Sequence, residues 1–259
     1  MTHLNKKISS LMAALCLTSV LLTACGGVTE EMLVTRESAI VMMEEGNYEG
    51  AVAAFNGLVE NAKKVTEFEL DILKYRAEAE FLLKDYEAAL HTYQTLKEVD
   101  KERPEYCYVS VMALANLGRI SDAEAMLEAG VKLDKKHEAA GYYEAKLALA
   151  DGYEACGNVD AAEGIYQELI ALGFGNSSIY NRLMLITMNE GDYEGALTWA
   201  AKGMILEDDL AMQELKFNEA VCYEFLGEFK KALELFKAYE AAYGSDERVA
   251  HEIAFLETR

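Results

Sequence analysis

The chain has 259 residues, and its 45 acidic residues against 24 basic ones give a formal net charge of -21 at pH 7. A protein this acidic repels the phosphates of nucleic acids and the head groups of anionic lipids, which argues against both as ligands. Ala, Leu and Glu are frequent and Pro104 is the single proline, a composition that favours helices. The acidic residues are scattered along helical patterns, as is typical of a solvated surface.

The first 24 residues have the pattern of a secretory signal peptide. Lys6 and Lys7 form a positive start, and residues 8–24 carry no charge and are apolar or small. A basic region followed by an apolar region is typical of such signals. The uncharged stretch is 17 residues long, shorter than the roughly 20 residues that a membrane-spanning helix needs. We therefore expect cleavage, with an uncleaved anchor as the alternative.

A cysteine stands where this signal ends. The sequence "LTAC" at residues 22–25 resembles the bacterial lipobox, in which a Leu and two small residues precede a Cys. The resemblance implies that Cys25 receives diacylglycerol on its sulfur and becomes the N-terminus after cleavage. The chain would then consist of a signal peptide (1–24), a lipidated tether (25–31) and a body (32–259), held at the extracytoplasmic face of the cell membrane or the outer membrane. The alternative is an ordinary cleavage site followed by an unmodified cysteine.

An internal repeat organises the body. Six times, a large apolar residue precedes an alanine by three positions. The large residues are Tyr48, Tyr86, Ile120, Val159, Tyr193 and Phe229, and the alanines are Ala51, Ala89, Ala123, Ala162, Ala196 and Ala232. Successive alanines are 38, 34, 39, 34 and 36 residues apart, which brackets the period of about 34 in tetratricopeptide repeats. The body therefore resembles the tetratricopeptide repeat family.

This resemblance implies an all-α fold, a right-handed α-solenoid of about six helix pairs. Each pair hides only part of its apolar surface, so stacking of neighbours forms the core. A glycine precedes the second helix of most units, but Lys84 replaces it in the second unit. The last segment, with Val249, Ile253 and Leu256 on one side, predicts a C-terminal capping helix that begins at Ser245.

The residues that would support catalysis or metal binding are missing from the sequence. His137 and His251 each lack a second histidine four residues on, and neither a nucleophile elbow nor a phosphate-binding glycine loop is present. The segment "LEDDL" at 206–210 lacks the spacing of a calcium loop, so we interpret it as the N-cap of a helix. The cysteines of the body, Cys107, Cys156 and Cys222, lie in helical apolar patterns and are expected to be small buried residues. We thus expect a protein that is not an enzyme and has no cofactor, no metal and no small-molecule substrate.

The resemblance also implies a binding surface, because the first helices of tetratricopeptide repeats line a groove that binds peptide segments. Carried over position by position, the groove residues of the first half are Tyr75, Glu78, Phe81, Glu105, Tyr108, Met112, Glu144, Asp151 and Glu154. Those of the second half are Asn181, Arg182, Glu214, Phe217, Asn218 and Glu224. Acidic side chains next to aromatic and Met side chains suit an extended protein segment with basic and apolar residues. For each of these residues, packing between helices is the alternative.

Not every ligand of the family is expected here. The Lys, Asn and Arg set with which some members hold a C-terminal carboxylate is absent from these positions, so that ligand is not predicted. The leading hypothesis is a membrane-anchored bacterial lipoprotein that acts as a scaffold or adaptor for protein–protein binding at the cell envelope. The alternative is a structural subunit of an envelope-biogenesis or secretion assembly. A third hypothesis, an enzyme with an unrecognised site, has no supporting residues.

Overall fold

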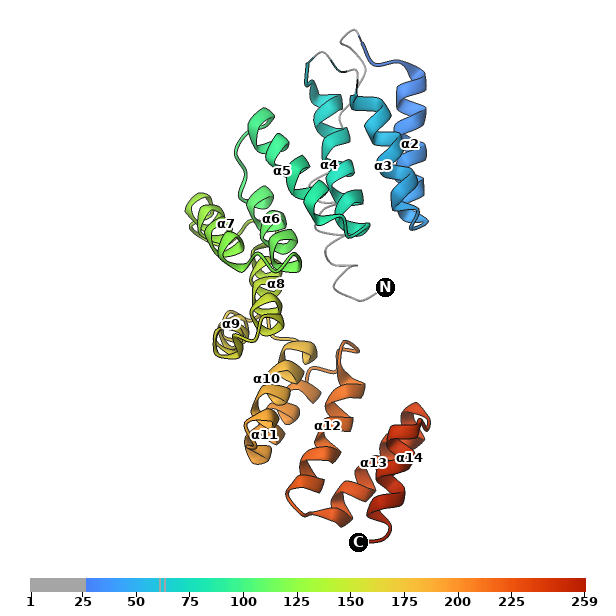
Figure 1. Cartoon of the computed structure of the whole chain (residues 1–259), viewed down its shortest axis with the longest axis vertical. Coiled ribbons are helices and arrows are strands. Elements are labelled where there is room, and N and C mark those ends of the chain that lie inside the picture. The colour runs from blue at the N-terminus through green and yellow to red at the C-terminus, as the bar shows by residue number, and fades with distance from the viewer. Residues whose placement is uncertain (1–26, 61, 63) are drawn as a thin grey trace. The chain divides into compact units, whose positions relative to one another are not determined.

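The computed structural model describes residues 27–60, 62 and 64–259, and all regular elements within them are helices (Figure 1). The signal peptide at 1–24, the lipidation site Cys25 and Gly26 lie outside the described residues. The helices are α2 (Glu30–Glu44), α3 (Tyr48–Val59), α4 (Glu67–Leu82), α5 (Tyr86–Val99), α6 (Pro104–Asn116), α7 (Ile120–Leu133), α8 (Tyr142–Ala155), α9 (Val159–Ala171), α10 (Ser177–Asn189), α11 (Tyr193–Met204), α12 (Met212–Phe225), α13 (Phe229–Tyr243) and α14 (Glu247–Leu256). The predicted all-α repeat fold is confirmed.

The second helix of every predicted pair begins at the large apolar residue of the repeat. These helices are α3, α5, α7, α9, α11 and α13. The sequence offers Asn47, Asp85, Asn158 and Asp192 as N-caps of these helices. Asn47, Asp85 and Asp192 each accept a hydrogen bond from the backbone N–H three residues on, whereas Asn158 makes no side-chain cap bond. This bond satisfies one of the donors that a helix start leaves without an intrahelical partner.

A tight turn joins the two helices of a pair. In the first pair the N–H of Gly46 donates to the carbonyl of Met43, and the N–H of Asn47 donates to the carbonyl of Met42. Gly46 has a φ of 80°, the left-handed backbone that this helix ending requires. The second pair has the same two bonds, with Lys84 at a φ of 66° in the place of the glycine.

The alanines of the repeat lie where helices approach one another most closely. All six have no exposed surface, and a methyl group is the largest side chain that such close backbones accommodate without strain. Each second helix therefore buries its alanine face, and in α3, α5 and α13 the aromatic residues Phe55, Tyr93 and Phe236 are buried as well.

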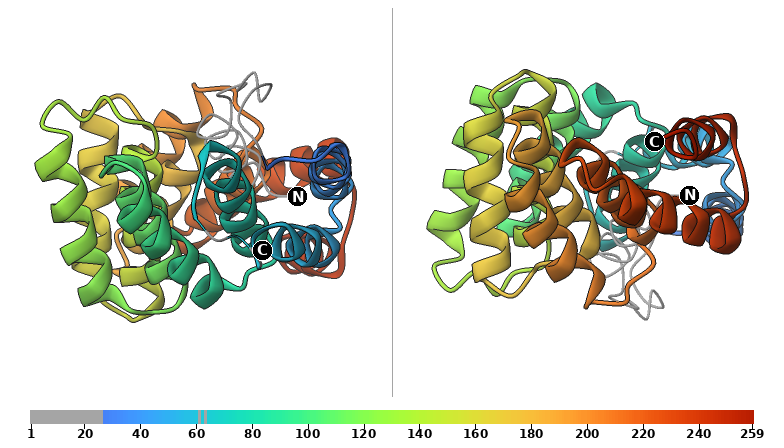
Figure 2. Two further views of the ribbon diagram at one scale, coloured as in Figure 1. Left: turned by 90° about the horizontal axis from the view of Figure 1, so that it is seen from above. Right: turned by 90° about the horizontal axis from the view of Figure 1, so that it is seen from below.

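The chain divides into two compact units, unit 1 (Met1–Gly157) and unit 2 (Asn158–Arg259). In unit 1 the first helices of successive pairs contact one another, α2 with α4 and α6 with α8. In unit 2, α10 contacts α12 in the same way. In unit 2, coloured from yellow to red in Figure 2, each helix contacts the next helix along the chain.

The last helix, α14, covers α13 as expected but begins later than predicted. Ser245 is not its N-cap: Asp246 is, and its carboxylate accepts a hydrogen bond from the N–H of Val249. Both residue types cap helices well, so the sequence does not separate two such neighbours. Val249 and Leu256 are buried in a cluster with Phe236, which confirms the predicted capping face.

The acidic segment before α12 does not cap that helix. Helix α12 follows Ala211, which has no side-chain cap. Asp208 instead accepts hydrogen bonds from the N–H and the hydroxyl of Ser177 at the start of α10, and the N–H of Ala211 donates to the Ser177 hydroxyl. The prediction of an N-cap in 206–210 was wrong. The Asp208 carboxylate binds Ser177, 31 positions away in the sequence, instead of the first turn of α12.

The three cysteines of the body are free thiols. Cys107 and Cys222 are buried, as expected, and burial raises the pKa of both thiols. Cys156 is exposed, so the expectation of burial was wrong for this residue. It is the C-cap of α8 and follows Ala155, which is exposed as well.

Candidate peptide-binding site in unit 2

Four of the predicted groove residues surround one pocket in unit 2. The pocket has a volume of about 310 Å³. Its lining consists of Asn181 and Leu185 from α10, Gln213, Glu214, Phe217 and Asn218 from α12, Tyr239 from α13 and Arg248 from α14. The predicted members are Asn181, Glu214, Phe217 and Asn218. They meet because α10 and α12 are the first helices of successive pairs and contact one another.

Phe217 and Tyr239 are the two aromatic residues that line the pocket, and Phe217 is the one of them that the sequence predicted as a groove residue. It is only 8% exposed and meets Phe236 and Tyr239 edge to face, with ring centroids 5.3 Å and 5.6 Å apart. The guanidinium carbon of Arg248 lies 3.8 Å from the centroid of the Phe217 ring. Contacts with Phe236, Tyr239 and Arg248 thus hold this ring on several sides.

Side-chain amides form the polar part of the lining. The Nδ2 of Asn218 donates to the Oδ1 of Asn181 at 3.0 Å, and the Nε2 of Gln213 donates to the hydroxyl of Tyr239 at 2.7 Å. Asn181 is 8% exposed. Each amide has both donors and acceptors, so one hydrogen bond per pair leaves capacity for a ligand. Such groups match the N–H and C=O of an extended peptide.

Two predicted residues of unit 2 lie outside this pocket. Arg182 is exposed on α10, and Glu224 is at the C-terminal end of α12. Burial raises the pKa of Glu224, the neighbouring Glu252 on α14 raises it further, and His251 and Arg259 oppose the shift.

In unit 1 the packing alternative holds for four of the nine predicted residues. Tyr108, Met112, Glu78 and Phe81 are at most 5% exposed, so a ligand does not reach their side chains. The hydroxyl of Tyr108, for example, donates to Asp134 at 3.1 Å, and burial together with this carboxylate raises the pKa of the phenol. Both the ring and the hydroxyl of Tyr108 are therefore buried in the core.

The other five predicted residues of unit 1 are partly exposed: Tyr75, Glu105, Glu144, Asp151 and Glu154. Tyr75 is stacked on Phe55 with centroids 6.0 Å apart, and the guanidinium carbon of Arg36 is 5.1 Å from its ring centroid. The four acidic residues lie on α6 and α8, which contact one another.

Sequence reasoning missed four residues of the unit 2 pocket: Leu185, Gln213, Tyr239 and Arg248. Leu185 lies on a first helix at the same repeat position as Met112, within the family's groove pattern, but was left out of the prediction, whereas Gln213 lies on a first helix at a position outside that pattern. Tyr239 comes from a second helix and Arg248 from the capping helix, and neither element carries groove residues in that pattern. No local signal in the sequence marks these two.

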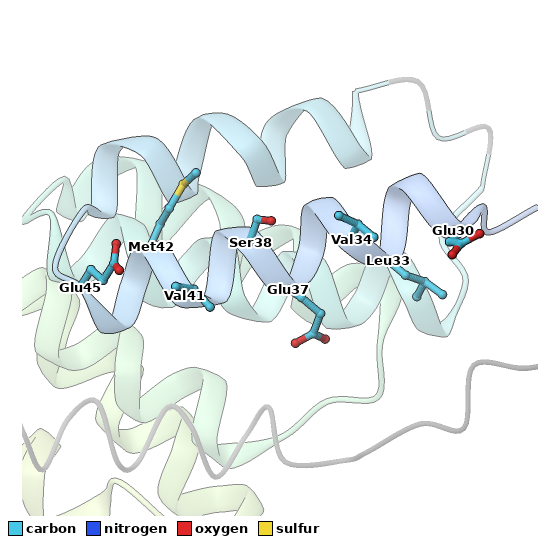
Figure 3. Close-up of a pocket in the computed structure, with 8 residues that line it drawn as sticks. All are labelled: Glu30, Leu33, Val34, Glu37, Ser38, Val41, Met42 and Glu45. Carbon is cyan, nitrogen blue, oxygen red and sulfur yellow. The ribbon is translucent and has the colours of Figure 1, made fainter.

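A second hollow lies along the outer face of α2 (Figure 3). Its apolar residues are Leu33, Val34, Val41 and Met42, and acidic residues stand at both ends and in the middle of the face. Val34 and Val41 are 60% and 48% exposed. All lining residues belong to this one helix or its C-cap, so the hollow has no groups converging from a second element.

The described part of the chain has neither a membrane-spanning helix nor a cluster of metal ligands. None of its helices combines the length and the apolar character needed to cross a bilayer. In the same residues, no three His, Cys, Asp or Glu side chains gather closely enough to hold a metal ion.

Helix pairs repeated along a chain, with a pocket between successive first helices, define the class of helical-repeat interaction scaffolds. Within that class the chain belongs to the tetratricopeptide repeat family, whose profile matches residues 38–104 and 108–177, more than half of the chain. Members of this family are scaffolds for protein–protein interaction, and the repeats of this chain make it one as well.

Among curated proteins none matches the chain. Several solved structures share its fold. A tetratricopeptide repeat protein from Parabacteroides merdae is 18% identical, with a TM-score of 0.57, over 98% of this chain and 92% of its own. PilW, described as a widely conserved type IV pilus biogenesis factor, is 16% identical, with a TM-score of 0.63, over 88% and 99%.

The apo form of the quorum sensor NprR from B. thuringiensis is another similar structure. It is 14% identical, with a TM-score of 0.63, over 88% of this chain and 70% of its own. At these identities the likeness concerns the fold alone.

Proposed function

We propose that the protein is a membrane-anchored bacterial lipoprotein whose repeats act as an adaptor and bind a protein or peptide partner at the cell envelope. The observation that carries this proposal is the convergence of Asn181, Glu214, Phe217 and Asn218 on one pocket. These positions come from two different helix pairs, so their meeting depends on the repeat architecture and not on local sequence.

The chemistry of the pocket suits an extended polypeptide segment. The amide pair Asn181–Asn218 offers a donor and an acceptor to one peptide group of the ligand. Phe217 and Leu185 form the apolar part of the pocket lining. In unit 1, the partly exposed acidic residues Glu105, Glu144, Asp151 and Glu154 support contact with a basic and apolar segment of the partner.

The anchor in this proposal is a lipid on Cys25. Thr29 caps helix α2 through a hydrogen bond from the N–H of Met32, so a short stretch, Gly26–Val28, joins the cysteine to the first helix. At about 3.3 Å per extended residue, unit 1 would stay within roughly 20 Å of the lipid. Two or more acyl chains provide stable attachment. The proposed location is the extracytoplasmic face of the cell membrane or the outer membrane.

Co-precipitation from membranes tests the binding role. The full chain with Asn181→Ala and Asn218→Ala is compared with the wild type and with Asn189→Ala, an exposed residue on the same helix α10. We expect the partner of the wild type to remain with Asn189→Ala and to be lost with the double variant. Recovery of the same partners by the double variant would contradict the proposal.

Labelling with a clickable fatty acid tests the anchor. Cys25→Ser should abolish the label and release the protein from the membrane fraction, because the thiol is the acceptor of the lipid. Cys156→Ser, which removes an exposed thiol of the body, should change neither. A wild-type protein without label, or one found in the aqueous fraction, would refute this part.

The second candidate is a structural subunit of an envelope-biogenesis or secretion assembly. The exposed apolar face of α2, with Val34 and Val41, favours it because such faces mark interaction surfaces. The similar structure PilW is described as a pilus biogenesis factor. A complex that survives purification without crosslinking would support this candidate over a transient adaptor.

A further inference from the structure

Helix α2 is apolar on two opposite sides. Its inner side, with Met32, Ile40 and Met43, packs on the core of the first pair. Its outer side presents Val34 and Val41, which are 60% and 48% exposed. A helix that is apolar all round is normally buried on all sides. The outer side of α2 is thus an apolar face that no described helix covers.

The same two positions are buried in all five later pairs. The residues that correspond to Val34 are Ile72, Tyr106, Ala145, Ile179 and Leu215, each at most 1% exposed. Those that correspond to Val41, at 79, 113, 152, 186 and 222, are buried as well.

In the later pairs a preceding second helix lies against this face. Each first helix from α4 to α12 contacts the second helix of the pair in front of it. The approach is close: a Cβ on Gly152 of α8 would lie 2.7 Å from Ile120 of α7. A Cβ on Gly203 of α11 would lie 2.8 Å from Leu215 of α12. The outer side of α2 is therefore the face that a helix covers everywhere else in the repeat.

Acidic residues surround this apolar face. Glu30 and Glu45 lie at its two ends and Glu37 lies in its middle, and all three are exposed. Arg36, the one basic residue between the two ends, is bound to Asp71 of α4 as well as to Glu37. The last turn of α2 has no basic residue, although a cation there would interact favourably with the helix dipole. These carboxylates therefore do not serve the stability of α2 itself.

We infer that the outer face of α2 binds an amphipathic helix of a partner protein, with Lys or Arg residues on both sides of the partner's apolar stripe. Val34, Ser38 and Val41 form one row along two turns of α2 (Figure 3), into which such a stripe packs. The basic residues then meet Glu37 and Glu45. The inference concerns a different surface from the proposed peptide-binding pocket and needs none of its residues. It gives the second candidate function a partner of defined chemistry.

Charge argues against the other occupants of this face. Two α2 helices from two copies of the chain would bring like charges together, Glu37 against Glu37 in a parallel pair and Glu30 against Glu45 in an antiparallel one. Like charges placed opposite one another oppose association. An anionic membrane surface repels the same three carboxylates.

Binding of synthetic helices to the full-length protein tests the inference. The protein is reconstituted in nanodiscs of phosphatidylcholine, which has no net charge, and empty nanodiscs give the background. The labelled peptides have about 18 residues, because shorter isolated helices are marginally stable. The basic peptide has a stripe of Leu and Ala flanked by Lys, the acidic peptide has Glu in place of Lys, and the scrambled peptide has the basic composition without the stripe. Fluorescence anisotropy measures the dissociation constants.

We expect the basic peptide to bind about tenfold more tightly than the acidic and the scrambled peptide. Val34→Gln together with Val41→Gln should weaken its binding about tenfold, since both valines contact the stripe. The matched control is Val99→Gln, which changes a valine of α5 that is 40% exposed and should have no effect. Asn181→Ala with Asn218→Ala should have none either, so the test is independent of the unit 2 pocket.

Charge reversal on α2 provides a readout that a loss of stability does not imitate. Glu37→Lys together with Glu45→Lys should invert the preference, so that the acidic peptide binds more tightly than the basic one. Thermal unfolding of each variant checks that the fold is retained.

Several results would overturn the inference. They are equal binding of the basic and the scrambled peptide, equal or tighter binding of the acidic peptide by the wild type, binding that survives the two valine changes, a preference that survives charge reversal, and no binding of any peptide. A crosslinked dimer of the wild type in vesicles that is lost with the valine changes would show that a second copy covers the face, and would contradict the inference as well.

Discussion

At the scale of single residues, Lys84 holds a backbone conformation that its side chain disfavours. Its φ is 66°, and the equivalent turns have Gly46, Gly118, Gly191 and Gly227 at similar angles. A Cβ in the left-handed region costs roughly 1 kcal/mol, partly offset because a glycine gives the unfolded chain more freedom. Lys84→Gly should therefore raise the free energy of unfolding by about 0.5 kcal/mol. Urea unfolding of the wild type and the Lys84→Gly variant measures this difference. A less stable variant would contradict backbone strain at Lys84.

Glu80 is a buried carboxyl whose ionisation opposes folding. The hydroxyl of Thr92 donates to it at 2.6 Å, and the Nε of Arg76 is 3.3 Å away. Burial nevertheless raises its pKa above the ordinary value of 4.5, with Thr92 and Arg76 opposing the shift. Its contribution to stability is thus fully present below pH 4.5 and is lost as the pH rises through the raised pKa.

This gives a pH-dependent prediction for Glu80→Gln, which keeps the shape but does not titrate. The free energy of unfolding of the variant, relative to the wild type, should increase as the pH rises from about 4 toward neutrality. Urea titrations of both proteins across this range measure the difference. A difference that does not change with pH would show that burial does not perturb this carboxyl.

At the scale of helices, substitutions of two glycines in unit 2 distinguish the effect of close packing from the effect of helix propensity. A Cβ on Gly203 of α11 would lie 2.8 Å from both Leu215 and Tyr180, whereas a Cβ on Gly164 of α9 would meet nothing within 4 Å. Gly203→Ala should destabilise the protein by about 1 to 3 kcal/mol through overpacking. Gly164→Ala should stabilise it by about 0.5 to 1 kcal/mol, since alanine favours helix. Thermal unfolding of the pair provides the comparison, and equal shifts would contradict the close approach.

The sequence predicted where helices start more reliably than which residue caps them. The large apolar residues from Tyr48 to Phe229 begin the second helices because their spacing reflects how pairs stack, a constraint that recurs in every unit. Capping depends on single contacts. Asp208 binds Ser177 of another helix, and the local sequence carries no information on that partner.

The candidate site was predicted only as far as it lies on first helices. Asn181 and Asn218 follow from the repeat positions, but Arg248 enters the pocket from the capping helix. In unit 1, Tyr108 at the repeat position of Asn181 and Met112 at the repeat position of Leu185 are buried. Burial depends on the neighbouring pair, so the position in the repeat does not by itself decide whether a residue faces a partner.

At the scale of the whole molecule, the repeats provide a scaffold, and the pocket of unit 2 is the place that we propose for a partner. The acidic surface disfavours nucleic acid and anionic lipid over the entire chain. In the proposed function, binding specificity comes from the pocket, whose lining includes Arg248 and the amides of Asn181 and Asn218.

Photo-crosslinking in living cells tests this central claim most directly. A photoreactive amino acid replaces Leu185, which lines the pocket, or Ala201, an exposed residue of α11, in the full chain. We predict a crosslinked second protein from position 185, none from position 201, and loss of the product when Asn181→Ala and Asn218→Ala are added. A product from position 201 alone, or one at position 185 that is unaffected by the two asparagine changes, would contradict the claim that this pocket holds the partner.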